Sequence, residues 1–213
     1  MSGTAEKPKV ALLVSGQKRT IRRVEDNINK FIQSVESNNN VTVDVYLSLD
    51  FETDCKITNV KNITVNNENI VRSEHFSHQM MRYNLGYNSI PNPEQYEWFI
   101  RTRPDLAINN FNTILETLDK SSVHARLRKS VKKLQPHEWS YVHYPITNID
   151  VMDDQFFIVH KNVAKNAFSI TRGTNPVTYD THPQHMPECV MTYMFMSHGI
   201  PIKTLKVDCR IVR

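Results

Sequence analysis

The sequence predicts an α/β domain built on a central, mostly parallel mixed sheet with helices on its faces. The first reason is the order of patterns between residues 10 and 49, where an apolar run, a glycine-containing loop, an amphipathic stretch and a second apolar run follow one another. Such alternation is typical of parallel strands joined by right-handed crossovers. The second reason is the aromatic, apolar run at 96–100, which predicts a strand in the middle of the sheet.

Length and composition place further bounds on the fold. The 213 residues are 39% hydrophobic and 23% charged, enough for one substantial core, so a single domain over 1–213 is expected. The net charge of +4 favours phosphate-bearing ligands but is too small to demand nucleic acid. No stretch is apolar enough to cross a membrane, residues 1–9 are polar, and three cysteines lack metal-ligand spacing. These features predict a cytoplasmic protein with reduced thiols.

The first half of the chain supplies the opening of a nucleotide-binding α/β unit. A continuous apolar run at 10–14 predicts a fully buried strand, and loosely alternating apolar residues at 42–49 predict a second one. Between them, apolar residues recur at steps of three and four and predict a helix over 21–35. The residues of that apolar face are Ile21, Val24, Ile28, Phe31, Ile32 and Val35.

The loop after the first strand is a candidate anion site. Gly16 allows the backbone to approach a ligand closely, and Lys18 and Arg19 lie at the start of a helix, where exposed N–H groups favour anions. The loop matches neither the dinucleotide fingerprint nor the P-loop. A plain turn with two solvated cations is the alternative.

The remaining elements follow the same alternation. Arg82, His75 and His78, on the helix expected at 73–90, are interpreted as a solvated face. The basic stretch at 124–133 is interpreted as a mobile loop, or as a flap that faces a phosphate or the acceptor. Because the chain ends on an expected strand, it is compatible with a domain cut from a longer polypeptide. The elements are an exposed strand within 51–69, a helix at 73–90, extended chain at 106–108, a helix at 110–118, strands at 139–144 and 156–159, and helices at 163–170 and 188–198 before a closing strand at 200–212.

The central strand ends in the segment Arg101-Thr102-Arg103-Pro104-Asp105. Pro104 cannot donate to a ladder and pushes Arg103 towards an extended backbone, so the strand stops there. Ligands in open α/β sheets collect at the carboxyl ends of strands. Two guanidinium groups and a carboxylate could hold a phosphate and its metal at such a place. The alternative is a surface corner in which Asp105 pairs with an arginine or caps the next helix.

Two further stretches carry candidate chemistry. Asp153 and Asp154 precede an apolar strand, and adjacent residues on extended backbone point in different directions, so the two should have separate roles. One could act as a general base while the other caps or orients, and an acidic turn is the alternative. His182 or His185 could reach a metal from a loop, although an exposed histidine is the simpler interpretation.

Four motifs in this order resemble the GT-A-type glycosyltransferases. They are Val-Ser-Gly-Gln-Lys-Arg-Thr at 14–20, Phe-Ile-Arg-Thr-Arg-Pro-Asp-Leu at 99–106, Asp-Asp-Gln-Phe at 153–156, and a Pro-Glu at 187–188 that precedes an apolar helix and Gly-Ile-Pro-Ile. More narrowly, they resemble the enzymes of large DNA viruses, including chlorovirus enzymes that glycosylate the major capsid protein, and of bacterial surface-polysaccharide clusters. The resemblance implies a nucleotide-sugar-binding half at about 1–110 and an acceptor-binding half at about 111–213.

The resemblance also implies a reaction and a site. A UDP-linked donor would transfer glucose, galactose or a deoxyhexose such as rhamnose to a glycan acceptor, as on a viral capsid glycoprotein, and the expected stereochemical outcome is inversion. Mn²⁺ or Mg²⁺ would bind the diphosphate, but the family's Asp-x-Asp triplet corresponds here to Arg103-Pro104-Asp105, so one carboxylate is missing. Donor contacts are expected from Ser15, Gly16, Gln17, Arg19, Arg103 and Asp105, metal contacts from Asp105 and His185, and general-base catalysis from Asp154 with Asp153 second.

Two other classes of function remain open from the sequence. A metal-dependent phosphodiesterase or nuclease could use Asp105, Asp153, Asp154 and histidines around two ions, although more converging carboxylates are usual. A non-catalytic module could bind nucleic acid through the basic stretch at 124–133, but that stretch has no interleaved aromatic residues on which bases could stack.

Overall fold

A seven-stranded mixed sheet runs through the computed structural model, with strand order β3-β2-β1-β4-β7-β6-β8. The pairs β1–β2, β2–β3, β1–β4 and β6–β8 are parallel, whereas β7 is antiparallel to both β4 and β6. The predicted fold class is therefore confirmed. The strands are β1 (Lys9–Gly16), β2 (Thr42–Leu49), β3 (Val60–Val65), β4 (Tyr96–Thr102), β6 (Val123–Lys129), β7 (Asp150–His160) and β8 (Ile202–Thr204). The structure describes residues 6–17, 20–50, 52–65, 75–129, 150–169, 191–192, 195–196 and 198–212.

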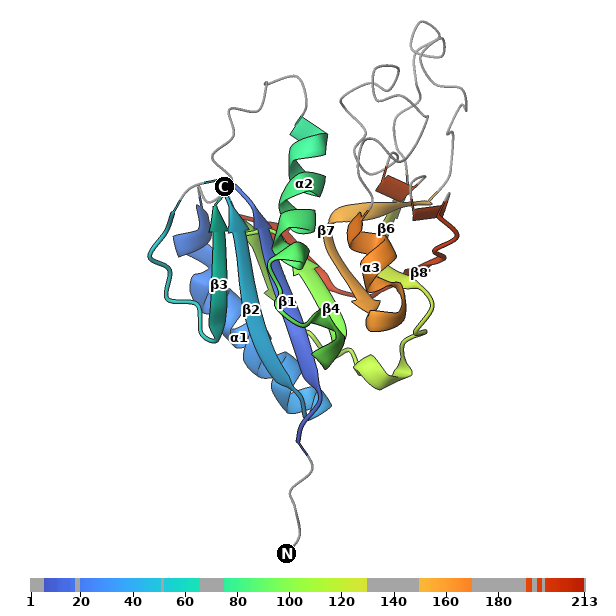
Figure 1. Cartoon of the computed structure of the whole chain (residues 1–213), viewed down its shortest axis with the longest axis horizontal. Helices are drawn as coiled ribbons and strands as arrows, with labels where there is room; N and C mark the ends of the chain where they lie inside the picture. The colour runs from blue at the N-terminus through green and yellow to red at the C-terminus, as the bar shows by residue number, and fades with distance from the viewer. Residues whose placement is uncertain are drawn as a thin grey trace, which may run out of the picture.

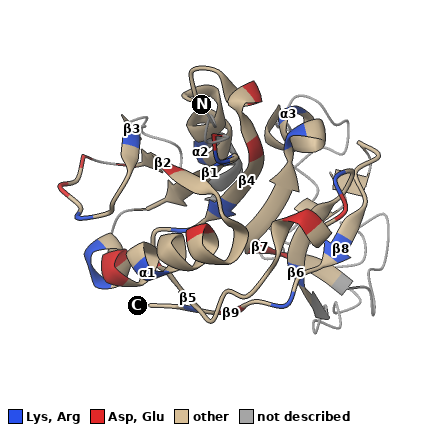
Figure 2. Ribbon diagram, turned by 90° about the horizontal axis from the view of Figure 1, so that it is seen from below, with Lys and Arg blue, Asp and Glu red and all other residues tan. Residues whose placement is uncertain are grey.

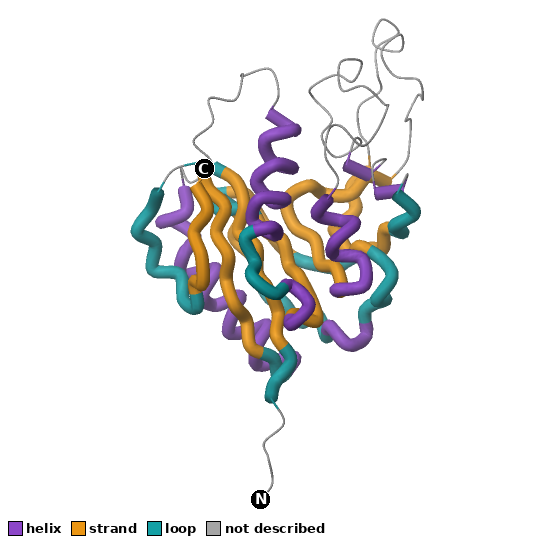
Figure 3. Tube along the Cα trace, viewed as in Figure 1, coloured by secondary structure: helices purple, strands orange, loops and turns teal. Residues whose placement is uncertain are grey.

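Helices and a short ribbon cover the two faces of this sheet. Figure 2 shows the sheet nearly edge-on, with α2 (His75–Asn88) and α3 (Lys161–Ser169) on one side. On the other side lie α1 (Ile21–Asn39) and a two-stranded antiparallel ribbon of β5 (Leu106–Asn109) and β9 (Asp208–Ile211). Figure 3 shows the same arrangement of helices and strands along the chain. No helix in the described part of the chain is long and apolar enough to cross a membrane.

Two apolar cores form, one on each face. The predicted apolar face of α1 is buried against β1, β2 and the β5–β9 ribbon, and it joins Phe111 and Phe156 in edge-to-face aromatic contacts through Phe31. On the opposite face, α2 and α3 bury aromatic side chains such as Tyr83 and Phe168 against β4 and β7. Because β1 is covered on both sides, its apolar run is continuous rather than alternating.

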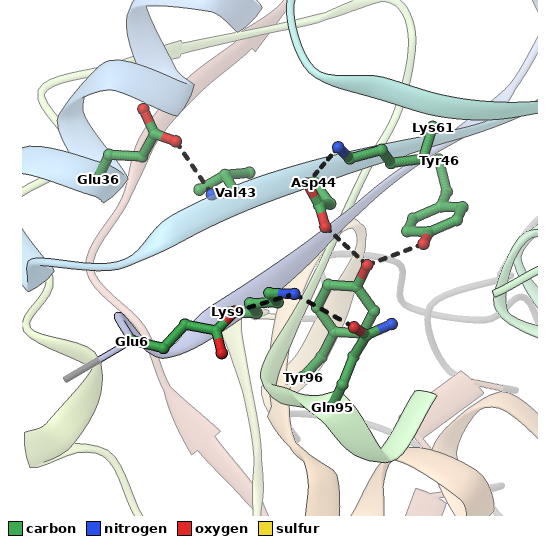
Figure 4. Close-up of polar contacts among 9 residues, drawn as sticks. All are labelled: Glu6, Lys9, Glu36, Val43, Asp44, Tyr46, Lys61, Gln95 and Tyr96. Atoms are coloured by element: carbon green, nitrogen blue, oxygen red, sulfur yellow. Dashed lines mark hydrogen bonds and ion pairs between the residues drawn. The ribbon is translucent and has the colours of Figure 1, made fainter. Parts of the chain in front are cut away.

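Polar groups link β2 and β4 beneath α2, towards the start of the strands. Tyr96 donates a 2.8 Å hydrogen bond to Asp44, and its hydroxyl lies 2.9 Å from that of Tyr46 (Figure 4). Asp44 also pairs with Lys61 on the neighbouring strand. Burial and these two partners raise the pKa of Tyr96 far above its ordinary value, so this buried hydroxyl stays neutral and satisfied.

The sheet reverses its direction of growth between β1 and β4. From β1 the chain passes through α1 to β2 and then β3 on one side, and α2 leads back to β4 on the other side (Figure 1). The carboxyl ends of β1, β2 and β4 consequently lie together at one edge of the sheet, called the carboxyl edge below. In open α/β sheets such a switch point is where ligands bind.

Three predicted elements differ from the structure. The basic stretch at 124–133 is not a loop as far as it is described, because residues 123–129 form β6. The predicted closing strand at 200–212 is divided into β8 and β9, which belong to different sheets. Of the predicted helix at 110–118, only a 3-10 turn at Leu115–Thr117 exists.

The side chains at the end of α1 explain the missing helix. Asn38 donates to the carbonyl of Phe111 at 2.9 Å, and Asn39 both donates to Thr113 O and accepts from Leu115 N. These bonds satisfy backbone groups that a helix would otherwise pair internally. The predicted strand at 139–144 lies outside the described residues.

Candidate functional site

The ends of β1 and β4 meet at the switch point through Gly16 and Pro104. Gly16 has a φ of +150°, and a Cβ placed on it would lie 2.8 Å from Cδ of Pro104. Glycine is therefore required here for a close approach, as the sequence indicated, but the atom that approaches belongs to Pro104. The contact fixes the first loop against the turn that ends the central strand.

Arg101 is completely buried beside this contact. Its Nε donates to Oγ of Ser15 at 3.2 Å, and its Nη1 donates to the backbone carbonyl of Asp154. Burial lowers the pKa of Arg101 to about 10, while the charge of Asp154 opposes that shift, so the guanidinium stays protonated at neutral pH. One cation thus connects β1, β4 and β7.

Arg103 and Asp105 form a two-bond ion pair across Pro104. Nε and Nη2 of Arg103 donate to the two carboxylate oxygens of Asp105 at 2.8 and 2.7 Å. Burial by itself lowers the pKa of Arg103, but the bonds and charge of Asp105, with the charges of Asp154 and Asp153, raise it overall. This pairing is one of the alternatives that the sequence left open. Both side chains remain partly exposed.

Asp153 and Asp154 were expected before the strand, but they lie inside β7, at a bulge of that strand. Ala125 pairs with Phe157 and Leu127 with Met152, so two steps along β6 match five steps along β7. Bulges of this kind re-aim side chains next to functional sites. Asp153 and Asp154 lie within the bulge and are both buried.

Asp153 is anchored by its neighbours. Its Oδ2 accepts hydrogen bonds from Nε and Nη2 of Arg126, and its Oδ1 accepts from the backbone N–H of Gln155 at 3.1 Å. Arg126 also donates to the carbonyl of Cys209 at 3.1 Å, which ties the bulge to the β5–β9 ribbon. Asp153 therefore holds the backbone that presents Asp154.

Three stretches that are distant in sequence converge at the carboxyl edge. Ser15 and Gly16 come from β1, Arg101 to Asp105 from the end of β4, and Asp153 and Asp154 from β7. The charges of Asp153 and Asp154 act on both Arg101 and Arg103. Gln17 follows Gly16 directly and is half-buried. Arg19 and His185 lie outside the described residues, as do Lys18, His182 and Glu188.

The described residues do not by themselves form a metal site. No group of three or more His, Cys, Asp or Glu side chains within the described ranges could hold a metal ion. Both oxygens of Asp105 are bonded to Arg103, so Asp105 could ligate an ion only by exchanging that partner. At the carboxyl edge these carboxylates lie together with two arginines, Arg101 and Arg103.

Sequence reasoning missed two arginines near this site. Arg126 was assigned to a loop, but apolar residues at every second position from Val123 to Leu127 are the signal of a strand with one buried face. Arg82 was placed on a solvated helix face, whereas it is a buried residue of α2. No local pattern distinguishes a buried arginine from an exposed one.

No protein-family model matches the chain, and no curated protein matches it in sequence. Among solved structures, the chain is similar to a glycosyltransferase involved in glycosylation of the major capsid of PBCV-1, at 15% identity and a TM-score of 0.47, over 93% of this chain and 82% of that one. It is also similar to the catalytic domain of Drosophila beta1,4galactosyltransferase 7 in complex with xylobiose, at 12% identity and a TM-score of 0.48. A mutant of the Drosophila enzyme in complex with manganese, UDP-Gal and xylobiose gives 11% identity and a TM-score of 0.48.

In both Drosophila comparisons, 92% of this chain covers 64% of the other chain, which is less than two thirds of its length. These three of the similar solved structures are glycosyltransferases.

Proposed function

We propose that this chain is a glycosyltransferase that moves a hexosyl or deoxyhexosyl group from a UDP-sugar to a glycan acceptor in the cytoplasm. The observation that carries the proposal is the convergence of Ser15–Gly16, Arg101–Asp105 and Asp153–Asp154 at a switch point of the sheet. These are the three described stretches that resemble glycosyltransferase motifs. The same resemblance suggests the glycan of a viral capsid glycoprotein as the acceptor.

The arginines supply the electrostatic part of the proposed reaction. Breaking the bond between the sugar and UDP leaves negative charge on a diphosphate, and preorganised cations stabilise that charge most effectively where water is excluded. Arg101 is buried and fixed, and Arg103 is partly exposed and able to exchange Asp105 for a phosphate. A divalent ion on Asp105 and His185 would add Lewis-acid stabilisation, but the described residues contribute only one carboxylate to it.

The two aspartates have different proposed roles. Asp153 is held by Arg126 and Gln155 and acts as a positioning residue. Asp154 is the proposed general base that accepts the proton of the acceptor hydroxyl, and direct displacement would invert the anomeric configuration. Because its backbone carbonyl accepts a bond from Arg101, the orientation of Asp154 is coupled to the donor side of the site.

A panel of nucleotide-sugars, assayed for hydrolysis and transfer with and without Mn²⁺, tests the proposal. We expect UDP-sugars to be used and UDP to raise the melting temperature. Stabilisation by metal alone would favour a phosphodiesterase, and stabilisation by oligonucleotides alone would favour a binding module.

Two substitutions test the assigned roles. Asp154→Ala should keep UDP binding and lose transfer by about 10²–10⁴-fold, the usual contribution of general-base catalysis. Asp105→Ala should abolish any Mn²⁺ dependence of UDP binding. The control is Asp54→Ala, because Asp54 forms an exposed pair with Arg22. Normal transfer by the Asp154→Ala protein would remove the base assignment.

A further inference from the structure

Among the described residues, buried polar atoms without a hydrogen-bond partner include three that concern the α2 side of the sheet. They are Nη2 of Arg101, Nε of Arg82 and Oγ of Ser48. The exposed fraction is 0% for Arg101, 6% for Arg82 and 1% for Ser48. Buried polar groups are almost always paired in folded proteins, so three such atoms in one region require a physical account.

These atoms belong to one region at the carboxyl edge. Ser48 on β2 is the register partner of Ser15 on β1, and Ser15 accepts the hydrogen bond from Arg101. The guanidinium of Arg101 in turn faces α2, because its Cζ lies 5.8 Å from the ring centroid of Tyr83 on that helix.

Arg82 reaches the same region from the helix. Gly86 of α2 sits directly on β1 and β2, since a Cβ placed on it would lie 3.2 Å from both Leu13 Cδ2 and Ser48 Cβ. Arg82 precedes Gly86 by four residues and so occupies the same face of the helix, about 6 Å along its axis. Figure 1 shows that α2 starts beyond the carboxyl edge and descends along the sheet, which places Arg82 on the edge side of Gly86.

The arrangement is costly without a ligand. A buried cation with unmade hydrogen bonds loses its hydration without full compensation. Burial lowers the pKa of Arg82, and the charge of Asp50 opposes this shift only in part. For Arg101, the charge of Arg103 adds to the effect of burial. A phosphate oxygen placed here would supply both the missing charge and the missing acceptors.

We propose that Arg82 and Arg101, with the hydroxyl of Ser48, form a binding site for the phosphate groups of a diphosphate ester on the α2 side of the carboxyl edge. The inference rests on the proposed function, because the nucleotide-sugar donor is the diphosphate ester in question. It adds Arg82 and Ser48, which no sequence motif indicated, to the donor-binding residues. It also assigns phosphate binding to two cations outside the Arg103–Asp105 pair.

Calorimetric titration of wild-type protein and the Arg82→Met variant with pyrophosphate, UDP and uridine tests this site. We expect pyrophosphate and UDP to bind about tenfold or more weakly to the variant, because hydrogen bonds to a charged group are lost, whereas any uridine affinity stays unchanged. The control is Arg22→Met, because Arg22 forms an exposed pair with Asp54. This variant should bind all three ligands as wild type does.

Melting temperature separates a ligand site from a structural arginine. Removing a buried cation that lacks full pairing should leave the melting temperature of ligand-free Arg82→Met equal to or above that of wild type. Arg82→Lys keeps the charge without the planar fork and should recover part of the pyrophosphate affinity. A melting temperature lowered in both variants would assign Arg82 a structural role and overturn the proposal.

The ligands distinguish failure of this inference from failure of the proposed function. Equal affinity of Arg82→Met and wild type for pyrophosphate and UDP overturns the phosphate site and leaves the glycosyltransferase standing. Loss of pyrophosphate binding in Arg82→Met, combined with a wild type that prefers pyrophosphate to UDP and uses no nucleotide-sugar, keeps the phosphate site and removes the glycosyltransferase. Absence of binding of both anions to wild type overturns the phosphate site.

Discussion

At the scale of single residues, Gly16 has no room for a side chain. Gly16→Ala would force a Cβ into Pro104 at a φ of +150°, and we expect a loss of about 1–3 kcal/mol in the free energy of unfolding. Gly199→Ala is the matched control, because Gly199 also has a positive φ but no atom lies within 4 Å of the added Cβ. Urea unfolding of both variants measures the difference. Equal losses would show that the contact with Pro104 contributes nothing beyond backbone strain.

Asp153 provides a second test at this scale. Asp153→Asn removes the charge from a fully buried carboxylate that pairs with Arg126, and we expect the free energy of unfolding to fall by about 1–3 kcal/mol. Asp54→Asn breaks an exposed pair and should cost less than about 0.5 kcal/mol. Denaturant titration of the two variants checks the contrast. A fully stable Asp153→Asn protein would contradict the positioning role.

At the scale of elements, Glu97 connects β4 to the junction between β7 and α3. Its carboxylate accepts from His160 at 2.8 Å and pairs with Lys161 at 2.9 Å. The hydrogen bond from His160 first, and that from Lys161 next, hold the pKa of Glu97 at about 2, below its ordinary 4.5. A carboxylate with a lowered pKa in the folded state stabilises it above the unfolded-state pKa, and this stabilisation is lost as the pH falls from about 4.5 towards 2.

Glu97→Gln should therefore lower stability at pH 6 by about 1–2 kcal/mol, a figure that allows for solvent screening of a side chain 28% exposed. The gap in melting temperature between wild type and Glu97→Gln should narrow as the pH is lowered through that window. Glu116→Gln, at an exposed position, should show no such trend. A gap that stays constant down to pH 2 would show that the interactions of Glu97 do not depend on its ionisation.

Elements whose pattern is local were predictable from the sequence, and those set by distant partners were not. The apolar stripe of α1 and the continuous apolar run of β1 each predict, from the local sequence alone, which residues are buried. In contrast, β6 carries charged side chains on its second face, and Arg126 is paired only because a bulge brings in Asp153 from 27 residues away. The segment at 110–118 has helical spacing, but asparagines of α1 hold its backbone in another form.

At the scale of the whole molecule, the two predicted halves share one sheet and both cores. Phe31 of α1 contacts Phe111 and Phe156, with ring centroids 5.0 and 5.8 Å away, so the first core joins residues from both halves. We expect far-ultraviolet circular dichroism and tryptophan fluorescence to report one unfolding transition. Phe31→Ala should shift both signals together and cost about 3–5 kcal/mol. Two separate transitions would show that the halves unfold independently.

The location of the candidate site could be predicted from the sequence, but most of its side-chain contacts could not. Parallel strands with ends at Gly16 and Thr102 put Ser15 and Arg101 at the same edge, which the strand order alone implies. The pairing of Asp105 with Arg103 is local, and it was one of the alternatives that the sequence left open. The burial of Arg101 and Arg82, in contrast, follows from tertiary packing, which no single stretch of sequence encodes.

The bond between Arg101 and Ser15 spans 86 positions of the chain. During synthesis on the ribosome, the partner of Ser15 is absent until the central strand has emerged, and the carbonyl that completes the grip on Arg101 comes 53 positions later. A nascent chain therefore cannot assemble the proposed anion site before residue 154 has been synthesised, so a ligand of that site can stabilise only a chain that extends at least to that point.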